Sequence, residues 1–329
     1  MARGINRREF GVGAFTAATA LLANAGLRAQ TSDWPVKPIR IIESFPAGVA
    51  RDPLTRILAG KLTAVLGQQV LVENHPGAGG RIAGEIAAHA SPDGYTYWMA
   101  AIGDLAVMKY LYKLPYDVDR DFTPVVMFLV VPAAVVVRPT LEARTLAELI
   151  AYAKQHPGEL TYGSTGIGQS LHLNGLLFQR AAGIELRHVP YAQGSPFNDL
   201  LGGHIDIVID AVNVPVEHIR AGRLRALAVT GTQRFAALPD VPTFTEAGLP
   251  AFDTHAGGGL LAPKETPAAI LAHMQSAVDG VLKDKTLRSQ WEPLGIQLVG
   301  GTPAQFADWI AAESTRWGTL IHETGLKIE

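Results

Sequence analysis

Two segments rich in small residues could bind an anion. The first is Ser44-Phe45-Pro46-Ala47-Gly48-Val49-Ala50-Arg51-Asp52, and the second runs from Tyr162 to Ser170. Each follows a predicted strand and precedes a predicted helix, so its backbone N–H groups should lie at a helix N-terminus, where the helix dipole supplies about half a positive charge. Open α/β sheets bind ligands beyond the carboxyl ends of their strands, where these turns lie. Two facing turns would hold a small carboxylate without an arginine; the alternative for each turn alone is a glycine-rich connection that binds nothing.

The sequence signatures of common enzymes are missing. Residues 163–166 approach the G-x-S-x-G nucleophile turn, but Tyr162 stands where the first glycine is needed. The glycine-rich segments 77–82 and 166–171 each lack the third glycine of a dinucleotide fingerprint. The chain has no cysteine, and its ten histidines include no H-E-x-x-H motif. We therefore expect no catalytic residue, no metal and no cofactor.

The elements that must position the two turns alternate between strand and helix in both halves of the chain. The predicted strands are 39–42, 70–72 and 95–99, then 134–137, 205–209 and 224–230. Helices are predicted over 53–66, where Gly67 supplies a stop, and over about 169–181. This alternation favours parallel sheets with helical crossovers. Since no Pro/Gly/Ser-rich linker separates the halves, we expect two α/β domains, each a mainly parallel sheet flanked by helices, joined by crossing strands.

Three helix starts carry capping signals. Thr145 and Glu148 form a capping-box pattern. Thr266 and Thr302 each precede a proline, which predicts an N-cap followed by proline at the first helical position.

The N-terminus has the pattern of an export signal. Arg3, Arg7 and Arg8 precede an uncharged apolar run from Phe10 to Ala23, and small residues follow. The pair Arg7-Arg8 favours a twin-arginine signal, and an ordinary Sec signal is the alternative. Removing residues 1–29, with cleavage expected between about 25 and 30, changes the net charge from −2 to −5. An acidic protein without a basic field is not expected to bind nucleic acid, and without cysteine it cannot be lipid-anchored through that residue.

The sequence resembles the substrate-binding proteins of tripartite tricarboxylate transporters, the TctC or Bug family, over residues 34–329. The resemblance rests on short strings in family order. They include Trp34-Pro35-Val36-Lys37-Pro38, Phe45-Pro46-Ala47-Gly48 with Asp52 and Arg56, Glu73-Asn74-His75-Pro76-Gly77-Ala78-Gly79-Gly80, Ser91-Pro92-Asp93-Gly94-Tyr95, Tyr162-Gly163-Ser164-Thr165-Gly166-Ile167-Gly168 with His172, Val189-Pro190-Tyr191 and Leu224-Arg225-Ala226-Leu227-Ala228.

The resemblance implies a hinged periplasmic binding protein with a Venus flytrap fold. It places residues 34–131 plus 253–329 in domain 1 and residues 132–252 in domain 2. It implies a small carboxylate ligand held between the two turns, and delivery to the membrane permease subunits of a tripartite transporter. A ligand-sensing role beside a sensor kinase is the alternative, followed by an exported enzyme on the same scaffold. The candidate ligand-binding residues are Phe45, Pro46, Ala47, Gly48, Val49, Arg51, Asp52, Gly103, Asp104, Gly163, Ser164, Thr165, Gly166, Gly168, His172, Tyr191 and Asp210.

The sequence departs from the family pattern at several of these positions. Val49 replaces a glycine, which favours an apolar or smaller ligand. Arg51 replaces a small polar residue and could anchor a second carboxylate or lie solvated at the cleft rim. Asp104 could pair with Arg51, receive an amino group or cap a helix. The family's lysine after Val-Pro-Tyr is replaced by Ala192.

Overall fold

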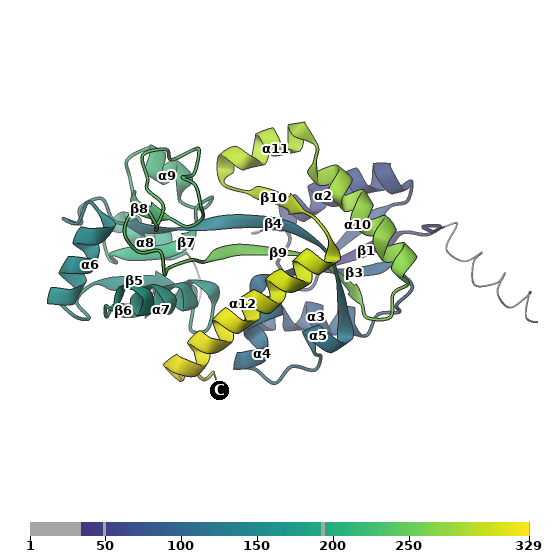
Figure 1. Ribbon diagram of the computed structural model, residues 1–329, viewed down its shortest axis with the longest axis horizontal. Coiled ribbons are helices and arrows are strands. Elements are labelled where there is room, and N and C mark those ends of the chain that lie inside the picture. Colours follow the sequence, from purple (N-terminus) through teal and green to yellow (C-terminus); the bar gives the residue numbers. More distant parts are fainter. Residues whose placement is uncertain (1–33, 49–50, 192–194, 329) are drawn as a thin grey trace, which may run out of the picture.

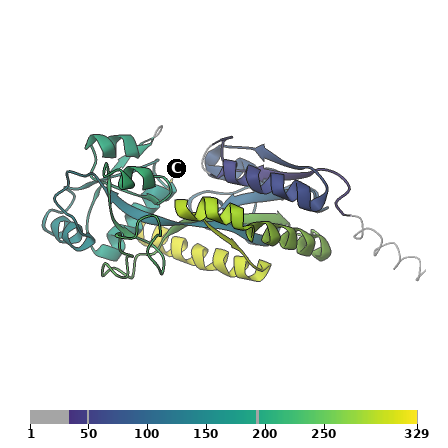
Figure 2. The ribbon, with the colours of Figure 1, turned by 90° about the horizontal axis from the view of Figure 1, so that it is seen from above.

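The computed structural model describes residues 34–48, 51–191 and 195–328. The predicted export signal, Val49 and the segment 192–194 lie outside the described residues. Within the described part the molecule is elongated, with a lobe at each end and long strands running between them (Figure 1). Seen from above, α2 and α10 lie in one lobe, and the helices of the middle of the chain lie in the other (Figure 2).

The first lobe combines the N-terminal part of the chain with the C-terminal part. Its N-terminal elements are β1 (Ile39–Glu43), α2 (Asp52–Leu66), β2 (Val70–Asn74), η1 (Ala78–Gly80), α3 (Arg81–Ala88), β3 (Thr96–Ala101), the π-helical turn η2 (Gly103–Val107), α4 (Met108–Leu111) and α5 (Val118–Asp121). Its C-terminal elements are β9 (His255–Pro263), α10 (Ala268–Leu282), α11 (Lys285–Trp291), η3 (Glu292–Leu294), β10 (Gln297–Gly300) and α12 (Pro303–Thr324).

The second lobe is built from the middle of the chain. Its elements are α6 (Leu146–Gln155), β5 (Thr161–Ser164), α7 (Ser170–Ala182), β6 (Arg187–Pro190), α8 (Pro196–Gly202), β7 (Ile207–Ala211), α9 (Val216–Arg220) and β8 (Arg225–Val229). The strands β5, β6 and β7 pair in parallel, as β1, β2 and β3 do in the first lobe.

One long strand, β4 (Phe122–Val137), belongs to both lobes. Its residues 122–132 pair antiparallel with β9, and residues 133–137 pair antiparallel with β7. The strand order β2-β1-β3-β9-β4-β7-β5-β6 is therefore continuous through the described part of the molecule. The predicted two-domain α/β fold with crossing strands is confirmed, and the crossing strands make the sheet as a whole mixed.

Both faces of the first lobe's sheet are covered, and β1 shows why its residues suit this position. Successive side chains of a strand point to opposite faces. Ile39 and Ile41 enter one apolar cluster with Leu58 of α2, while Ile42 enters another with Trp98 and Phe306. All three isoleucines are fully buried, as expected for a strand with helices on both sides.

Of the three predicted helix caps, those at Thr302 and Thr145 are found and the one at Thr266 is not. Thr302 caps α12 in a full capping box with Gln305. Thr145 caps α6, but the Glu148 carboxylate accepts from the Arg144 amide (2.6 Å) rather than from Thr145, so the predicted box is incomplete. The prediction at Thr266 is wrong, because its hydroxyl donates to the Pro263 carbonyl (2.8 Å) and Pro267 occupies the cap position.

Candidate ligand-binding site

The main cavity lies between the two lobes and has a volume of about 580 Å³. It opens where β1, β3 and β5 end and along the end of β7, as expected for an α/β sheet. Its lining is largely apolar. The polar or charged lining residues are Ser44, Arg51, Asp104, Thr165, Gln169, Ser170, Asn174, Asp210, Asn213 and His255.

The first predicted turn, between β1 and α2, brings Phe45, Pro46 and Arg51 to the cavity wall. Its amides are partly used by the chain's own carboxylates. The Phe45 amide donates to Glu43 (3.3 Å), and the Gly48 amide donates to Asp52 (2.7 Å). The amides of Phe45 and Gly48 are therefore not free to bind a ligand anion.

The N-terminus of α2 is similarly occupied. The amides of Leu54 and Thr55 both donate to the Arg51 carbonyl (2.9 and 3.0 Å), and Pro53 has no N–H. Asp52 supplies a carboxylate to the first helical turn, which already complements the helix dipole. This helix end is therefore poorly suited to a second anion.

Arg51 takes neither of the two roles that the sequence suggests for it, an anchor for a second carboxylate or a solvated residue at the cleft rim. Its side chain is 7% exposed, so it is not a solvated rim residue. Its Nη2 donates to Glu43 (2.8 Å) and to the Met99 carbonyl (2.7 Å), and its Nε donates more weakly to Glu43 (3.4 Å). Only Nη1 lacks a partner among the described residues, so Arg51 cannot offer a two-nitrogen fork to a ligand carboxylate while it is paired with Glu43.

Asp52 stands behind the first turn rather than on the cavity wall. Burial alone would raise the pKa of this fully buried carboxyl, but hydrogen bonds from Asn74, Gly48 and Arg56 outweigh it and lower the pKa. Asp52 therefore stays ionised and holds the Gly48 turn to α2.

The second predicted turn, between β5 and α7, leaves more of its helix end open. Thr165, Gly168 and Ser170 line the cavity. The first amide of the helical ladder is that of Leu173, which donates to the Gln169 carbonyl (3.1 Å), so the amides of residues 170–172 precede it. No acidic residue lies in the first turn of α7, and Gln169 makes no side-chain cap. This helix end keeps its positive character for a ligand.

Two stacked histidines support the second turn from behind. The Gly168 amide donates to Nδ1 of His172 (3.0 Å), and the His172 ring stacks on His188, with centroids 4.2 Å apart. Burial, aided by His188, lowers the pKa of His172 to about 4, so the ring is neutral near pH 7 and can accept this bond. His172 is absent from the cavity lining and acts as a support for the turn.

Ser164 and His188 form a close pair, with Oγ and Nε2 2.6 Å apart. A serine and a histidine at this distance could form a nucleophile with its base. Ser164 is fully buried, however, and it does not line the cavity. Its hydroxyl instead accepts from the Gly166 amide (3.1 Å), which shapes the turn.

Two carboxyl groups lie in the cavity wall on opposite sides. In the first lobe, Asp104 is 4% exposed and accepts from the Ala101 amide (2.8 Å), and burial raises its pKa to about 6. It lies inside the π-helical turn, so the predicted helix cap is not found. In the second lobe, burial raises the pKa of Asp210 to about 7.

Some of the candidate residues line the cavity and others do not. Those on the cavity wall are Phe45, Pro46, Arg51, Gly103, Asp104, Thr165, Gly168 and Asp210. Those absent from the cavity lining are Ala47, Gly48, Asp52, Gly163, Ser164, Gly166, His172 and Tyr191. Tyr191, for example, donates its hydroxyl to Asp199 (2.6 Å).

Sequence reasoning missed several polar or glycine residues of the wall. Gly77, Gly79 and Gly80 form a glycine-rich turn after β2, and a turn of this kind after a strand is the signal that could have identified them. Asn174 lies one helical turn beyond Ser170, so it could have been found by its spacing. His255 carried no signal, because the strand that presents it was not predicted.

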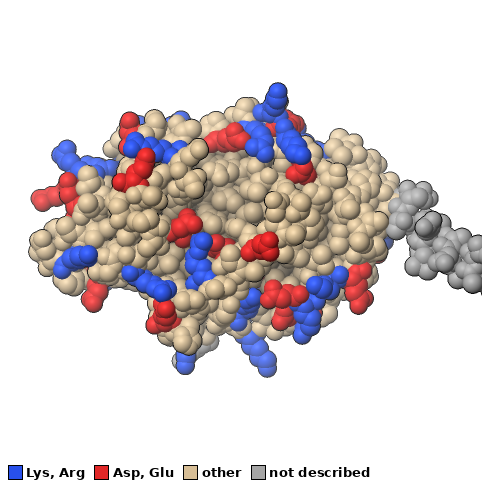
Figure 3. Space-filling model, viewed as in Figure 1, with Lys and Arg blue, Asp and Glu red and all other residues tan. Residues whose placement is uncertain are grey.

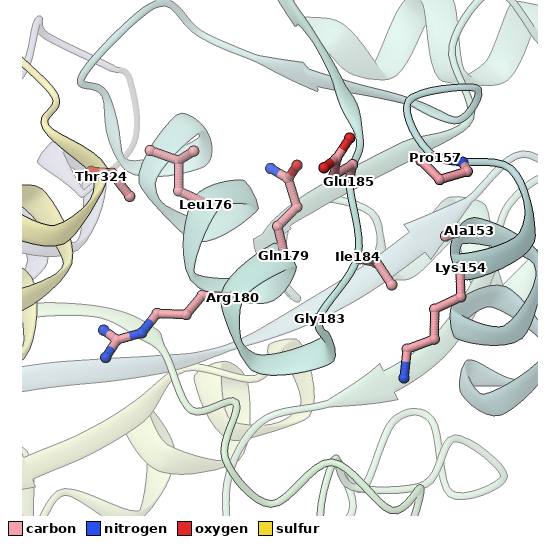
Figure 4. Close-up of a pocket in the computed structure, with 10 residues that line it drawn as sticks. All are labelled: Ala153, Lys154, Pro157, Leu176, Gln179, Arg180, Gly183, Ile184, Glu185 and Thr324. Atoms are coloured by element: carbon pink, nitrogen blue, oxygen red, sulfur yellow. The ribbon is translucent and has the colours of Figure 1, made fainter.

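A second hollow of about 460 Å³ lies on the outside of the second lobe, between α6 and α7 (Figure 4). Its two basic side chains, Lys154 and Arg180, point away from each other. Arg180 is also paired with Glu323 of α12 (2.7 Å). Nothing here converges on a ligand.

Basic and acidic side chains are interspersed on the face shown in Figure 3. Among the described residues, no three His, Asp or Glu side chains come together as a metal site. No described helix combines the length and apolar character needed to cross a bilayer.

Comparison with known proteins gives consistent matches over nearly the whole chain. Residues 54–326 match the model of the tripartite tricarboxylate transporter family receptor. Protein BugT of Bordetella pertussis is 36% identical over 313 residues, which cover 94% of this chain and 96% of that protein.

Two solved structures match 90% and 88% of this chain over the whole of their own length. One is an R. palustris protein with adipate (32% identity, TM-score 0.79), and the other is MatC from Rhodopseudomonas palustris with bound malate (30%, 0.75). The chain belongs to the tripartite tricarboxylate transporter receptor family, the TctC or Bug family of periplasmic solute-binding proteins.

Proposed function

We propose that this protein captures a small organic carboxylate in the cavity between its lobes and delivers it to the membrane permease subunits of a tripartite transporter. The observation that carries the proposal is the open N-terminus of α7. Three amides precede its hydrogen-bond ladder, no acid lies in its first turn, and Ser170 and Leu171 line the cavity. A carboxylate there would receive several N–H bonds and the favourable end of the helix dipole.

The ligands of two similar proteins support the carboxylate class. One is described with adipate and the other with malate. We extend this ligand class, but no single compound, to the present chain. Family membership likewise supports export to the periplasm, with residues 1–29 as the signal.

We propose that capture closes the two lobes about β4 and the start of β9. The limits would be 34–131 plus 253–329 for one domain and 132–252 for the other. Support comes from β4, which changes partner from β9 to β7 between Pro132 and Ala133. Beside this point, the Thr230 hydroxyl accepts from the Ala133 amide (2.8 Å) and donates to the Thr254 carbonyl (2.6 Å). These bonds tie together the segments that must bend.

A thermal-shift screen of the protein lacking residues 1–29 tests the function. Carboxylates, amino acids, sugars and cations are compared at equal concentration. A ligand at 100 times its dissociation constant adds about 2.7 kcal/mol to the free energy of unfolding, which is several degrees in melting temperature. We expect shifts with carboxylates. Shifts with sugars or cations and none with any carboxylate would contradict the proposal.

A further inference from the structure

Asp210 is a carboxyl group in the wall of a cavity that is proposed to bind carboxylates. It is the penultimate residue of β7, a strand that lies against α7 because the Ile209 carbonyl accepts from Asn174 Nδ2 (3.3 Å). Asn174 lies one turn beyond Ser170 on α7, and all three of Ser170, Asn174 and Asp210 line the cavity. Asp210 and the start of α7, where the anion would bind, therefore line the same cavity.

Few groups of the protein stabilise a negative charge on the Asp210 carboxyl group. Its Oδ1 accepts from the amide of the next residue, Ala211 (2.7 Å). Among the described residues, no side chain donates to it and no Lys or Arg forms an ion pair with it. Burial raises the pKa of Asp210 to about 7, and the Ala211 bond opposes this only in part. A proton can therefore be held here near neutral pH.

The neighbouring titratable groups do not supply Asp210 with a partner that would neutralise its charge. On the elements packed against β7 they are Tyr162 of β5, His172 and Arg180 of α7 and Asp199 of α8, while β4 carries none. Across the cavity they are Arg51, Asp104 and His255. Arg180 pairs with Glu323, Asp199 accepts from Tyr191, and Arg51 pairs with Glu43, so none of these neutralises Asp210.

A charged Asp210 beside a bound carboxylate would place two negative groups together in a shielded cavity, and such pairs bind a proton readily. A protonated Asp210 instead has an O–H that can donate to the ligand, and a bond from a carboxylic acid to a carboxylate is a strong one. The proton comes from water, and no covalent bond to the ligand forms or breaks.

We propose that Asp210 makes ligand capture depend on a proton: the ligand carboxylate binds together with one proton, which Asp210 holds and donates as a hydrogen bond. This inference rests on the proposed function and deepens it. The receptor would select carboxylates over cationic groups at this end of the cavity and bind them more weakly in alkaline conditions.

Titration calorimetry at pH 6 to 8.5 tests the proposal on the protein without its first 29 residues. Benzoate, malate and adipate serve as separate probes, and each titration is repeated in two buffers of different ionisation enthalpy. Proton uptake should rise from near zero at pH 6 toward one at pH 8.5. The dissociation constant should increase by about 30-fold over this range, since linkage approaches tenfold per pH unit above the pKa of the free group.

Two variants locate the proton. Asp210→Asn keeps the size and a donating N–H but cannot titrate, so its dissociation constant should no longer change with pH and proton uptake should vanish. Asp104→Asn removes the other shielded carboxyl, and the change above pH 7 should persist in that variant. Persistence of proton uptake in Asp210→Asn would overturn the assignment to Asp210.

The remaining outcomes separate this inference from the proposed function. If the probes bind without proton uptake and with a constant dissociation constant, the inference is wrong and the carboxylate receptor stands. Tighter binding at alkaline pH with proton release would also overturn it, because Asp210 would then be pairing with a cation. If no carboxylate binds at any pH, in this assay or in the thermal-shift screen, the proposed function fails with it.

Discussion

The two strand–turn–helix junctions of this protein start from similar sequences and end with different chemistry. Both have a glycine in the left-handed region with the same φ of 76°, Gly48 in the first and Gly168 in the second. In the first junction the glycine amide donates to the charged carboxylate of Asp52, and in the second it donates to the neutral ring of His172. The first helix end already holds an acid of its own, and the second does not.

The difference shows that a small-residue turn at a helix start is not sufficient for an anion site. A helix N-terminus stays available to a ligand anion only if no carboxylate of the chain itself already occupies it. Glu43 and Asp52 supply carboxylates in the first lobe, and Arg51 is drawn into the same group through Glu43. In the second lobe the corresponding supports are uncharged, so the helix end remains available.

The largest effect should follow from breaking the charged group of the first junction. Arg51→Met leaves the fully buried Glu43 without its ion partner, and removing one member of a buried pair costs about 3–5 kcal/mol. Denaturant unfolding measures this loss. The double change Glu43→Gln with Arg51→Met should recover much of it. A loss below 1 kcal/mol in the single variant would show that solvent reaches the pair.

A smaller effect should appear in the pH dependence of the free energy of unfolding, which should differ between the two junctions. His172 has a lowered pKa in the folded protein, so the unfolded chain binds more protons between pH 6.5 and about 4, and its contribution to stability is lost as the pH falls through that window. The full contribution is up to about 3 kcal/mol. Asp52 also has a lowered pKa, but from a value near 3.8, so its contribution is lost only below about pH 4.

Denaturant unfolding of wild type, His172→Phe and Asp52→Asn across pH 4 to 7 checks this. Asp104 and Asp210 have raised pKa values, so their contributions fall as the pH rises, and only differences from the wild type are compared. The difference between wild type and His172→Phe should shrink as the pH falls from 6.5 to 4, whereas that for Asp52→Asn should stay constant. Equal pH dependence in both variants would remove the distinction between the two supports.

The smallest effect compares the two glycines directly. A side chain in the left-handed region costs about 1–2 kcal/mol at either position. A Cβ at Gly48 would meet nothing within 4 Å, whereas one at Gly168 would lie 2.0 Å from Ile328 Cδ1, so the Ile328 side chain must also move. Gly168→Ala should weaken carboxylate binding by about tenfold, and Gly48→Ala by less than threefold. Calorimetry of the two variants at one pH gives the ratio, and equal losses would mean that both turns hold the ligand.

Much of the fold could be predicted because its signals are local. The apolar spacing before Gly67 predicted α2 to within one residue, and the run 134–137 predicted the end of β4 but not its residues 122–133. The strand His255–Pro263 was missed because Gly257, Gly258 and Gly259 weaken the strand pattern. These glycines are explained by close packing, since a Cβ at Gly258 would lie 2.0 Å from the Ala100 carbonyl oxygen.

The parts of the site that could not be predicted depend on contacts between distant segments. Arg51 was expected to face a ligand or solvent, because nothing in the sequence shows that Glu43 points to the same place across the turn. The stacking of His172 on His188 joins α7 to β6, and spacing along the chain gives no sign of it. The turns themselves were predictable, but which turn stays open was not.

A structure of the protein with a bound carboxylate would show which of the two turns holds the anion. We expect a carboxylate oxygen within about 3.2 Å of a backbone nitrogen at the start of α7, among residues 170–172. We also expect the Glu43–Arg51 pair to remain intact. A carboxylate held by the first turn, including Arg51, with no contact to α7, would contradict this prediction.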